Sequence, residues 1–217
     1  MSRTRIIAAV VVVALAGGGA YLLTKDDNGD KSSESTSQTA NNQTGSEGNF
    51  SPVSTEGLEF KATLTTTKDG TNTVATIEQD DQKNIRYTAT QGGQQVEIIY
   101  TKDAYYMCTA GNCIKYPISQ QGSAGFDPGT YTYDASKLEG YKNNSAYKGQ
   151  KSCPAGTCDV WSVTAGGYTS TIYVDTKTKR ISQVESTVNG ATTKIVYEYT
   201  DVTITVPTNA QTLPNAQ

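Results

Sequence analysis

The feature that most constrains the fold of this chain is a series of short segments in which apolar and polar residues alternate. Residues 60–64 (FKATL) and 202–206 (VTITV) both show this pattern. Successive side chains of a β-strand point to opposite faces of a sheet, so such segments are typical of strands with one buried and one solvated face. The pattern predicts a mainly β protein built on an antiparallel sheet.

Turn sequences separate these segments. Residues 68–71 (KDGT), 91–94 (QGGQ) and 188–191 (VNGA) contain the glycines that tight hairpins use, because glycine tolerates positive φ. Residues 80–83 and 175–178 are weaker turn candidates. The expected strands that carry most apolar residues are 58–65, 95–100, 171–174, 181–188, 194–199 and 202–206.

One segment is predicted to be helical. Asp134 can cap a helix over 135–140, which its last residue, a glycine, would end after about a turn and a half. The surrounding segment 117–150 is otherwise irregular and separates two groups of strands, 58–117 and 147–206. Neither group is expected to close a core alone, so we expect one domain. Either its sheet curls onto itself, or segment 117–150 lies across the mouth of the sheet and leaves a cavity.

The N-terminus predicts a membrane segment. Arg3 and Arg5 precede an uncharged apolar run from Ile6 to Leu23, long enough to nearly cross a hydrocarbon core of about 30 Å. The positive charges orient the remaining chain away from the cytoplasm. Residues 14–16 (ALA) would suit signal-peptide cleavage, but the apolar run continues beyond them, which favours a retained signal anchor over residues 1–23.

Composition divides the rest of the chain. Residues 24–56 are polar and carry six acidic and two basic residues, so we expect a disordered linker. The acidic stretch 26–30 lacks the glycine spacing of a calcium loop, and no metal site is predicted there. Residues 57–210 are the expected extracytoplasmic β domain, and residues 211–217 a flexible tail.

Four cysteines lie in two similar loops, Cys108-Thr-Ala-Gly-Asn-Cys113 and Cys153-Pro-Ala-Gly-Thr-Cys158. Residues opposed at a hairpin mouth lie within disulfide reach, and exported thiols oxidise. The favoured interpretation is two local disulfides, 108–113 and 153–158. A four-cysteine zinc site is the weaker alternative, because four-residue gaps lie at the upper edge of zinc spacing.

The composition disfavours most catalytic classes. The chain has no histidine, which excludes Ser-His-Asp and Cys-His catalysis as well as histidine-ligated metals. Its net charge of −3 argues against nucleic-acid binding. The acidic residues are scattered, although a glycosidase pair formed in space is invisible at this level. We therefore expect a protein that is not an enzyme and needs no cofactor.

Two stretches of the chain resemble a known group of proteins. Residues 169–210 contain the segments IYVD, RISQV and YEYTDVTITVP, and residues 84–117 contain a run of short strands. Both resemble the periplasmic lipoprotein-carrier superfamily, which includes LolA/LolB-like and LppX/LprG-like proteins. The resemblance implies a strongly curved antiparallel half-barrel whose concave apolar face binds lipid. It also implies that the irregular segment 117–150 lies across this face as a movable lid. The chain departs from this group in lacking a lipobox cysteine and in having only one predicted helix.

The favoured function is a membrane-anchored extracytoplasmic module that binds a lipid, or the acyl chain of a lipoprotein, on the concave sheet. A structural or adhesive surface domain with a filled core is the main alternative, and an enzyme acting on envelope polymers is the third. The 14 tyrosines fit either a packed sheet or an aromatic groove. The predicted apolar lining of the binding face is Phe60, Leu64, Val96, Ile98, Ile172, Val174, Val184, Ile195, Val202 and Ile204.

Overall fold

The structure is a computed structural model that describes residues 49–118 and 127–212. This part of the chain forms one sheet of twelve strands, an α-helix, α1 (Ala135–Lys142), and a 3₁₀ helix, η2 (Pro128–Tyr131). The strands are β1 (Phe60–Lys68), β2 (Thr71–Gln79), β3 (Ile85–Gln91), β4 (Gln94–Tyr100), β5 (Ala104–Thr109), β6 (Asn112–Pro117), β7 (Ser145–Cys153), β8 (Gly156–Ala165), β9 (Tyr168–Asp175), β10 (Ile181–Val188), β11 (Ala191–Glu198) and β12 (Gln211–Thr212).

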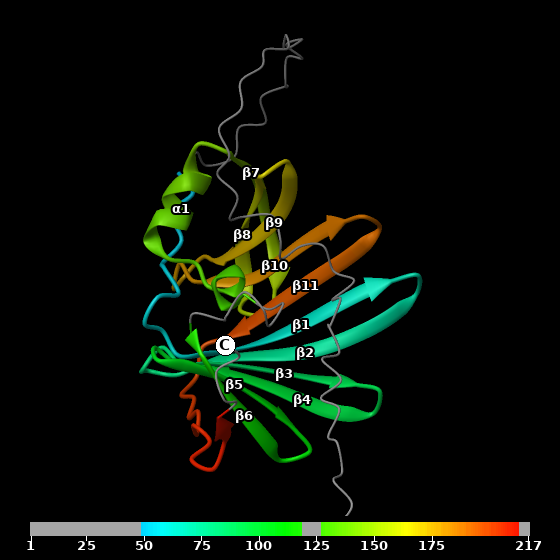
Figure 1. Cartoon of the computed structure of the whole chain (residues 1–217). Coiled ribbons are helices and arrows are strands. Elements are labelled where there is room, and N and C mark those ends of the chain that lie inside the picture. Colours follow the sequence, from blue (N-terminus) through cyan, green and yellow to red (C-terminus); the bar gives the residue numbers. More distant parts are fainter. Residues whose placement is uncertain (1–48, 119–126, 213–217) are drawn as a thin grey trace, which may run out of the picture.

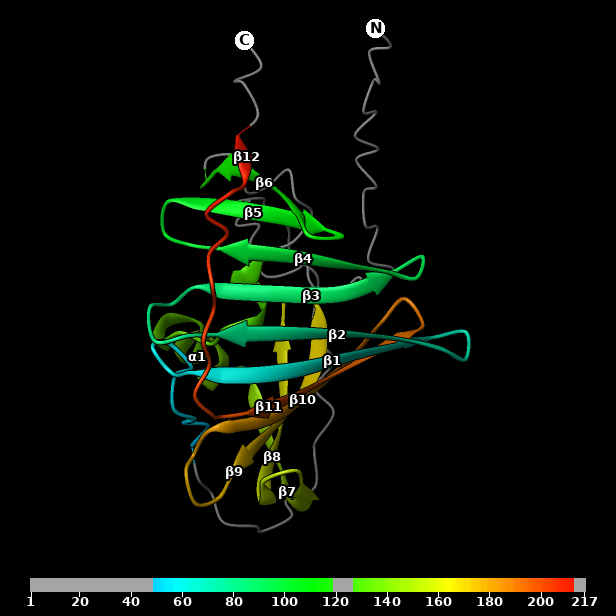
Figure 2. The ribbon, with the colours of Figure 1, turned by 90° about the horizontal axis from the view of Figure 1, so that it is seen from below.

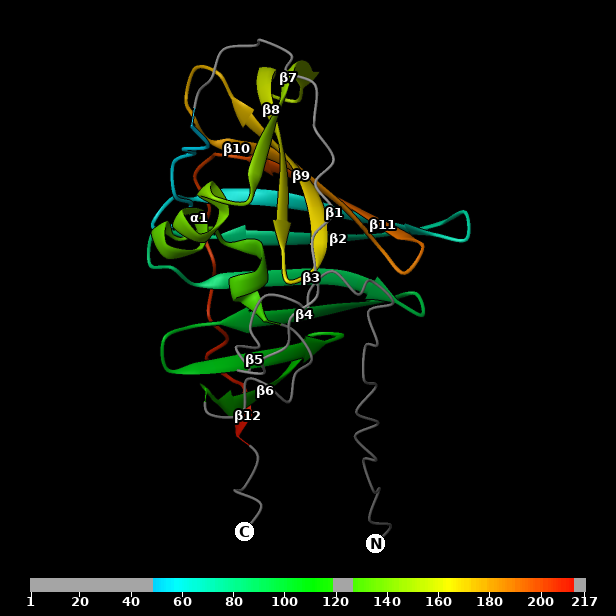
Figure 3. The ribbon, with the colours of Figure 1, turned by 90° about the horizontal axis from the view of Figure 1, so that it is seen from above.

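The sheet consists of two meanders joined edge to edge. Its strand order is β12-β6-β5-β4-β3-β2-β1-β11-β10-β9-β8-β7, so the long-range pairing of β1 with β11 unites the two groups of strands. All pairs are antiparallel except β12 with β6, which makes the sheet mixed. The sheet is strongly curved and open, and α1 and η2 lie over its concave face (Figures 1 and 3). The predicted curved β fold is therefore confirmed in its coarse form.

The three predicted hairpins are present. They join β1 to β2, β3 to β4, and β10 to β11. In the last of these turns Asn189 and Gly190 have φ values of 51° and 77°. Such left-handed conformations are tolerated by glycine and asparagine, which explains how this short sequence reverses the chain.

Helix α1 begins as predicted but ends later. The Asp134 side chain accepts a hydrogen bond of 2.7 Å from the backbone N–H of Lys137, as expected for an N-cap. The prediction that Gly140 ends the helix is wrong, because α1 continues to Lys142. The extra residues include Tyr141, whose ring is buried in the core, so tertiary packing outweighs the low helix propensity of one glycine.

The predicted strand at 202–206 is also not present. This segment crosses the convex face of the sheet instead (Figure 2). Ile204 is buried there against a small apolar cluster that includes Ile99 and Tyr106, and the backbone N–H of Val202 donates to the Glu59 carboxylate. The apolar side chains of this segment pack on the convex face of the sheet and the residues between them are exposed, so its sequence alternates like that of a strand.

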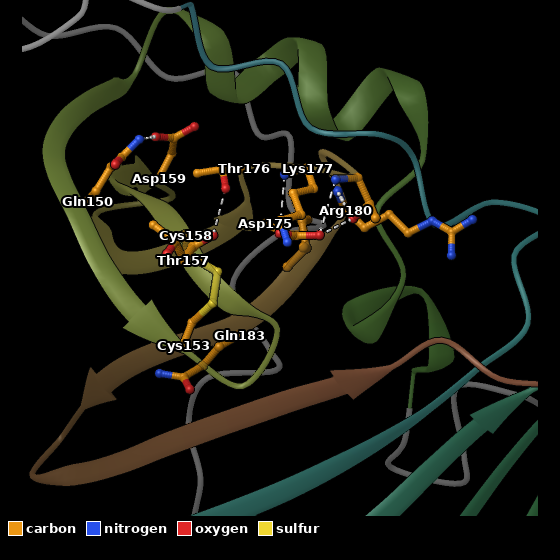
Figure 4. Close-up of a disulfide and its surroundings, with 12 residues drawn as sticks. Gln150, Cys153, Thr157, Cys158, Asp159, Asp175, Thr176, Lys177, Arg180 and Gln183 are labelled. Atoms are coloured by element: carbon orange, nitrogen blue, oxygen red, sulfur yellow. Dashed lines mark hydrogen bonds between the residues drawn. A yellow bond between two sulfur atoms is a disulfide. The ribbon is translucent and has the colours of Figure 1, made fainter.

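Both predicted disulfides are confirmed. Cys108 and Cys113 are opposed in the β5–β6 hairpin and are bonded to each other. Cys153 and Cys158 close the β7–β8 hairpin (Figure 4). The structure contains no free cysteine among the described residues, so the thiols that a zinc site would need are not available there.

The predicted membrane segment and most of the linker lie outside the described residues. Within residues 49–118 and 127–212, no helix is sufficiently long and apolar to span a bilayer. Phe50 and Thr55 are both buried in the domain, although they precede the predicted boundary at residue 57. At the other end Gln211 and Thr212 form β12, whereas residues 213–217 of the predicted tail are not described.

Candidate apolar-ligand site

The concave face of the sheet holds the main apolar cluster of the protein. Strand register shows how it is built, since residues paired across the strands lie in rows on one face. One such row runs through Ala75, Leu64, Ile195, Val184 and Ile172, from β2 to β9. All five side chains are buried. The row continues to Trp161 on β8, so an unbroken apolar band crosses both meanders.

The next row towards the hairpin tips is hydroxylated. It runs through Thr73, Thr66, Thr193, Ser186 and Ser170 on the same face of the sheet. The Oγ1 atoms of Thr66 and Thr193 lie 3.3 Å apart. Thr73 is exposed and the other four are half-buried, so the concave face changes from apolar to uncharged polar where it leaves the buried interior.

Tyrosines dominate the end of the interior formed by β4, β5 and β6. The Tyr105 ring stacks between Tyr100 and Tyr116, with ring centroids 5.6 and 4.8 Å away. Burial is the main cause that raises the pKa of Tyr105 and of Tyr100. These phenols stay neutral at physiological pH and contribute apolar surface with a polar edge.

A small cover lies over the concave face. We define it as residues 127–144, which contain η2 and α1. Its inward side chains are Tyr131, Tyr133, Leu138 and Tyr141, all buried in the main cluster. The Tyr197 hydroxyl on β11 donates to the main-chain oxygen of Tyr131 at 3.0 Å and connects the cover to the sheet.

Lys137 holds the two helices of the cover together. Its Nζ donates hydrogen bonds of 3.0–3.2 Å to the main-chain oxygens of Gly129, Thr130 and Thr132, and it lies 4.6 Å from the centroid of the Tyr133 ring. Burial lowers the pKa of Lys137 to about 8, against the opposing effect of Asp134. Carbonyl dipoles and the aromatic face of Tyr133 therefore take the place of water around the ammonium group of Lys137.

A segment missed by sequence reasoning runs beside the cover. We call residues 50–58 the strap. Phe50 is 2% exposed and its ring contacts those of Tyr141 and Trp161, at 6.4 and 5.6 Å between centroids. The only signal in the sequence was an isolated phenylalanine after a long polar stretch, which the linker composition concealed.

The structure brings most of the predicted lining residues together. Seven belong to the concave cluster. Val96 is partly buried and lies on the same face, because Val96 and its partner Ala89 are each two residues along their strands from the paired cluster residues Ile98 and Tyr87. Val202 and Ile204 are the exceptions, since they pack on the convex face instead. The seven clustered residues are Phe60, Leu64, Ile98, Ile172, Val174, Val184 and Ile195.

The convex face has a polar hollow of about 410 Å³ over β1–β4. At its centre Arg86 lies 2.6 Å from the Glu78 carboxylate and 3.8 Å from that of Glu97. The guanidinium is already neutralised by these two acids, so the hollow is better explained as a surface ion-pair network than as an anion site.

No family model and no curated protein sequence matches the chain. Among solved structures, it is similar to LppX from Mycobacterium tuberculosis, at 11% identity and a TM-score of 0.47 over 66% of this chain and 87% of that one. It is also similar to LprF from Mycobacterium bovis, at 14% identity and a TM-score of 0.46 over 72% and 91%. A LolA superfamily protein from Nitrosomonas europaea shows 9% identity and a TM-score of 0.30 over 67% and 87%.

These structures include members of both groups named in the resemblance, LppX and the LolA superfamily. At such identities and TM-scores the likeness carries no argument about a ligand.

Proposed function

We propose that this protein is an extracytoplasmic module that binds a lipid or acyl chain between the concave face of its sheet and the cover. The observation that carries the proposal is the mismatch between the two layers. Nine strands, from β1 to β5 and from β8 to β11, contribute buried apolar side chains to the interior. The layer over them contributes five, which are Phe50 of the strap and Tyr131, Tyr133, Leu138 and Tyr141 of the cover. A sheet face of this size normally needs a full second layer of helix or sheet.

The location in the cell is part of the same proposal. Two disulfides favour an oxidising compartment. The apolar run at residues 6–23, with arginines before it, would hold the domain at the outer side of a membrane. A binding module attached in this way would receive its ligand from the membrane or from a partner at its surface.

A structural domain with a filled interior is the alternative. It is favoured by the burial of the concave side chains against other parts of the protein, since Phe60 and Ile77 have no exposed surface. The two functions differ in whether the interior can take up a guest molecule.

Lipid extraction decides between them. The full chain, purified from membranes in mild detergent, would be extracted with organic solvent and the extract analysed by mass spectrometry. We expect one lipid class at near-stoichiometric amounts. A parallel preparation of the Val184→Trp variant should carry much less, because the larger ring fills the interior. Equal lipid in both preparations would indicate detergent-bound lipid and would favour the structural alternative.

A further inference from the structure

The strap connects the cover to the sheet through a small set of buried hydrogen bonds. Thr55 has no exposed surface, and it exchanges two bonds with one residue of the cover. Its backbone N–H donates to the main-chain oxygen of Tyr133 at 2.9 Å, and its Oγ1 accepts from the backbone N–H of Tyr133 at 2.7 Å. Ser54 Oγ donates to the same Tyr133 oxygen at 2.9 Å.

The other side of the strap is fastened to both meanders. The buried Gln79 side chain on β2 donates from Nε2 to the main-chain oxygens of Thr55 and Leu58, at 3.1 and 2.7 Å. The backbone N–H of Val53 donates at 2.7 Å to the oxygen of Lys179, in the turn between β9 and β10. The strap is therefore a fixed part of the sheet layer. The cover meets it through ring contact of Tyr141 with Phe50 and through hydrogen bonds at Tyr133.

Tyr133 is well placed to control the cover. It lies between η2 and α1, and its ring contacts those of Tyr141 on α1 and Tyr197 on β11. If Tyr133 left the strap, its backbone N–H and C=O would lose their partners, and the ring would leave the interior with the cover. Buried backbone groups without partners are costly, so the contact between Thr55 and Tyr133 opposes opening.

We propose that the strap is a latch, and that separation of Tyr133 from Thr55 is the step that opens the interior to a ligand. The hydrogen bonds of Thr55 and Ser54 with Tyr133 hold the cover, whereas control of ligand exchange by the latch rests on the proposed function. The strap stays on the sheet during opening, because Gln79 and Val53 keep their bonds when the cover moves.

A conservative pair of variants at residue 55 tests the latch in the full chain. Thr55→Val keeps the side-chain shape but removes the acceptor for the Tyr133 N–H, whereas Thr55→Ser keeps the hydroxyl. Hydrogen exchange followed by mass spectrometry should show residues 127–144 exchanging at least fivefold faster in the valine variant, with β10 and β11 unchanged. The serine variant should stay close to the wild type.

Two results would overturn the latch. One is equal exchange of residues 127–144 in the two variants, and the other is uniform acceleration over the whole domain. If Thr55→Val fails to fold, Ser54→Ala provides a milder test at a half-buried residue. It removes one bond to the cover, from Ser54 Oγ to the Tyr133 oxygen, and one exposed bond within the strap, from the Glu56 N–H to Ser54 Oγ. We expect this variant to accelerate exchange of the cover about twofold to fivefold, and no acceleration would again contradict the latch.

Release of a fluorescent lipid tests control of the ligand. The full chain would be loaded with a pyrene-labelled diacylglycerol and mixed with excess phosphatidylcholine vesicles. The probe should leave Thr55→Val at least fivefold faster than Thr55→Ser. Equal release rates would show that the latch does not control the site. If no variant binds the probe, the proposed function fails, and the exchange experiment still decides whether the strap holds the cover.

Discussion

The phenol of Tyr197 and the main-chain oxygen of Tyr131 form the direct hydrogen bond between the central strand β11 and the helix η2, at 3.0 Å. Both residues are about 5% exposed, so water does not replace this bond when it is lost. This bond joins the cover directly to the sheet in the middle of the apolar interior.

The Tyr197→Phe variant should therefore destabilise the protein. The ring keeps its packing against Phe60 and Tyr133, but the Tyr131 oxygen loses this donor in a buried position. We expect a loss of about 1–2 kcal/mol in the free energy of unfolding, measured by urea denaturation. Tyr168→Phe, at the half-buried hairpin position between β8 and β9, is the control and should change stability by less than about 0.5 kcal/mol.

Stability should rise when the pH increases from about 7 to 9.5. Burial lowers the pKa of Lys137 to about 8, so between pH 8 and its unfolded pKa near 10.5 the unfolded state binds more protons than the folded state. Because Lys137 retains some exposure, we expect a gain on the order of 1 kcal/mol. Lys137→Met should remove this rise, whereas a rise that persists in the variant would contradict the assignment.

Above about pH 10 stability should fall. Burial is the largest cause that raises the pKa of Tyr133, Tyr197 and Tyr199 above the ordinary value, so the unfolded chain loses these protons first. Urea denaturation at pH 9.5 and 11 measures the loss. The Lys137→Met variant should show the same fall, because its tyrosines are unchanged.

Enlarging the concave row should reduce ligand binding. Val184 lies between Ile195 and Ile172 in that row, and a tryptophan there would occupy the space of a guest. Binding of a pyrene-labelled lipid should fall at least tenfold with the β-sheet signal in circular dichroism retained. The matched control is Thr63→Trp, which adds the same ring to an exposed outward-facing position of β1 and should bind like the wild type.

Removing the second disulfide should cost little. Cys153 and Cys158 close a loop with a sequence separation of five, so their bond restricts the unfolded chain only modestly. The double alanine variant should be less stable by about 2 kcal/mol, measured by denaturation, and should remain folded. Complete unfolding would show that the bond has a larger role, in holding the β7 edge of the sheet.

Local sequence determined the elements whose causes lie within a few residues. The hairpins at Gly70, Gly93 and Gly190 followed from the need for positive φ, and both disulfides followed from opposed cysteines in short loops. The capping of α1 by Asp134 has the same local origin. Alternation also assigned seven lining residues to the buried side, because a strand has only two faces.

Tertiary structure decided what depends on residues far apart in the chain. Alternation places Ile204 on a buried side, but only the apolar patch around Ile99 decides that this side lies against the convex face. Thr55 and Phe50 looked like linker residues because their partners, Tyr133 and Trp161, are about 80 to 110 positions away. The pairing of β1 with β11 likewise joins distant segments and creates the shared interior. Local patterns indicate which side chains are buried, whereas the surface against which they are buried depends on how the whole chain folds.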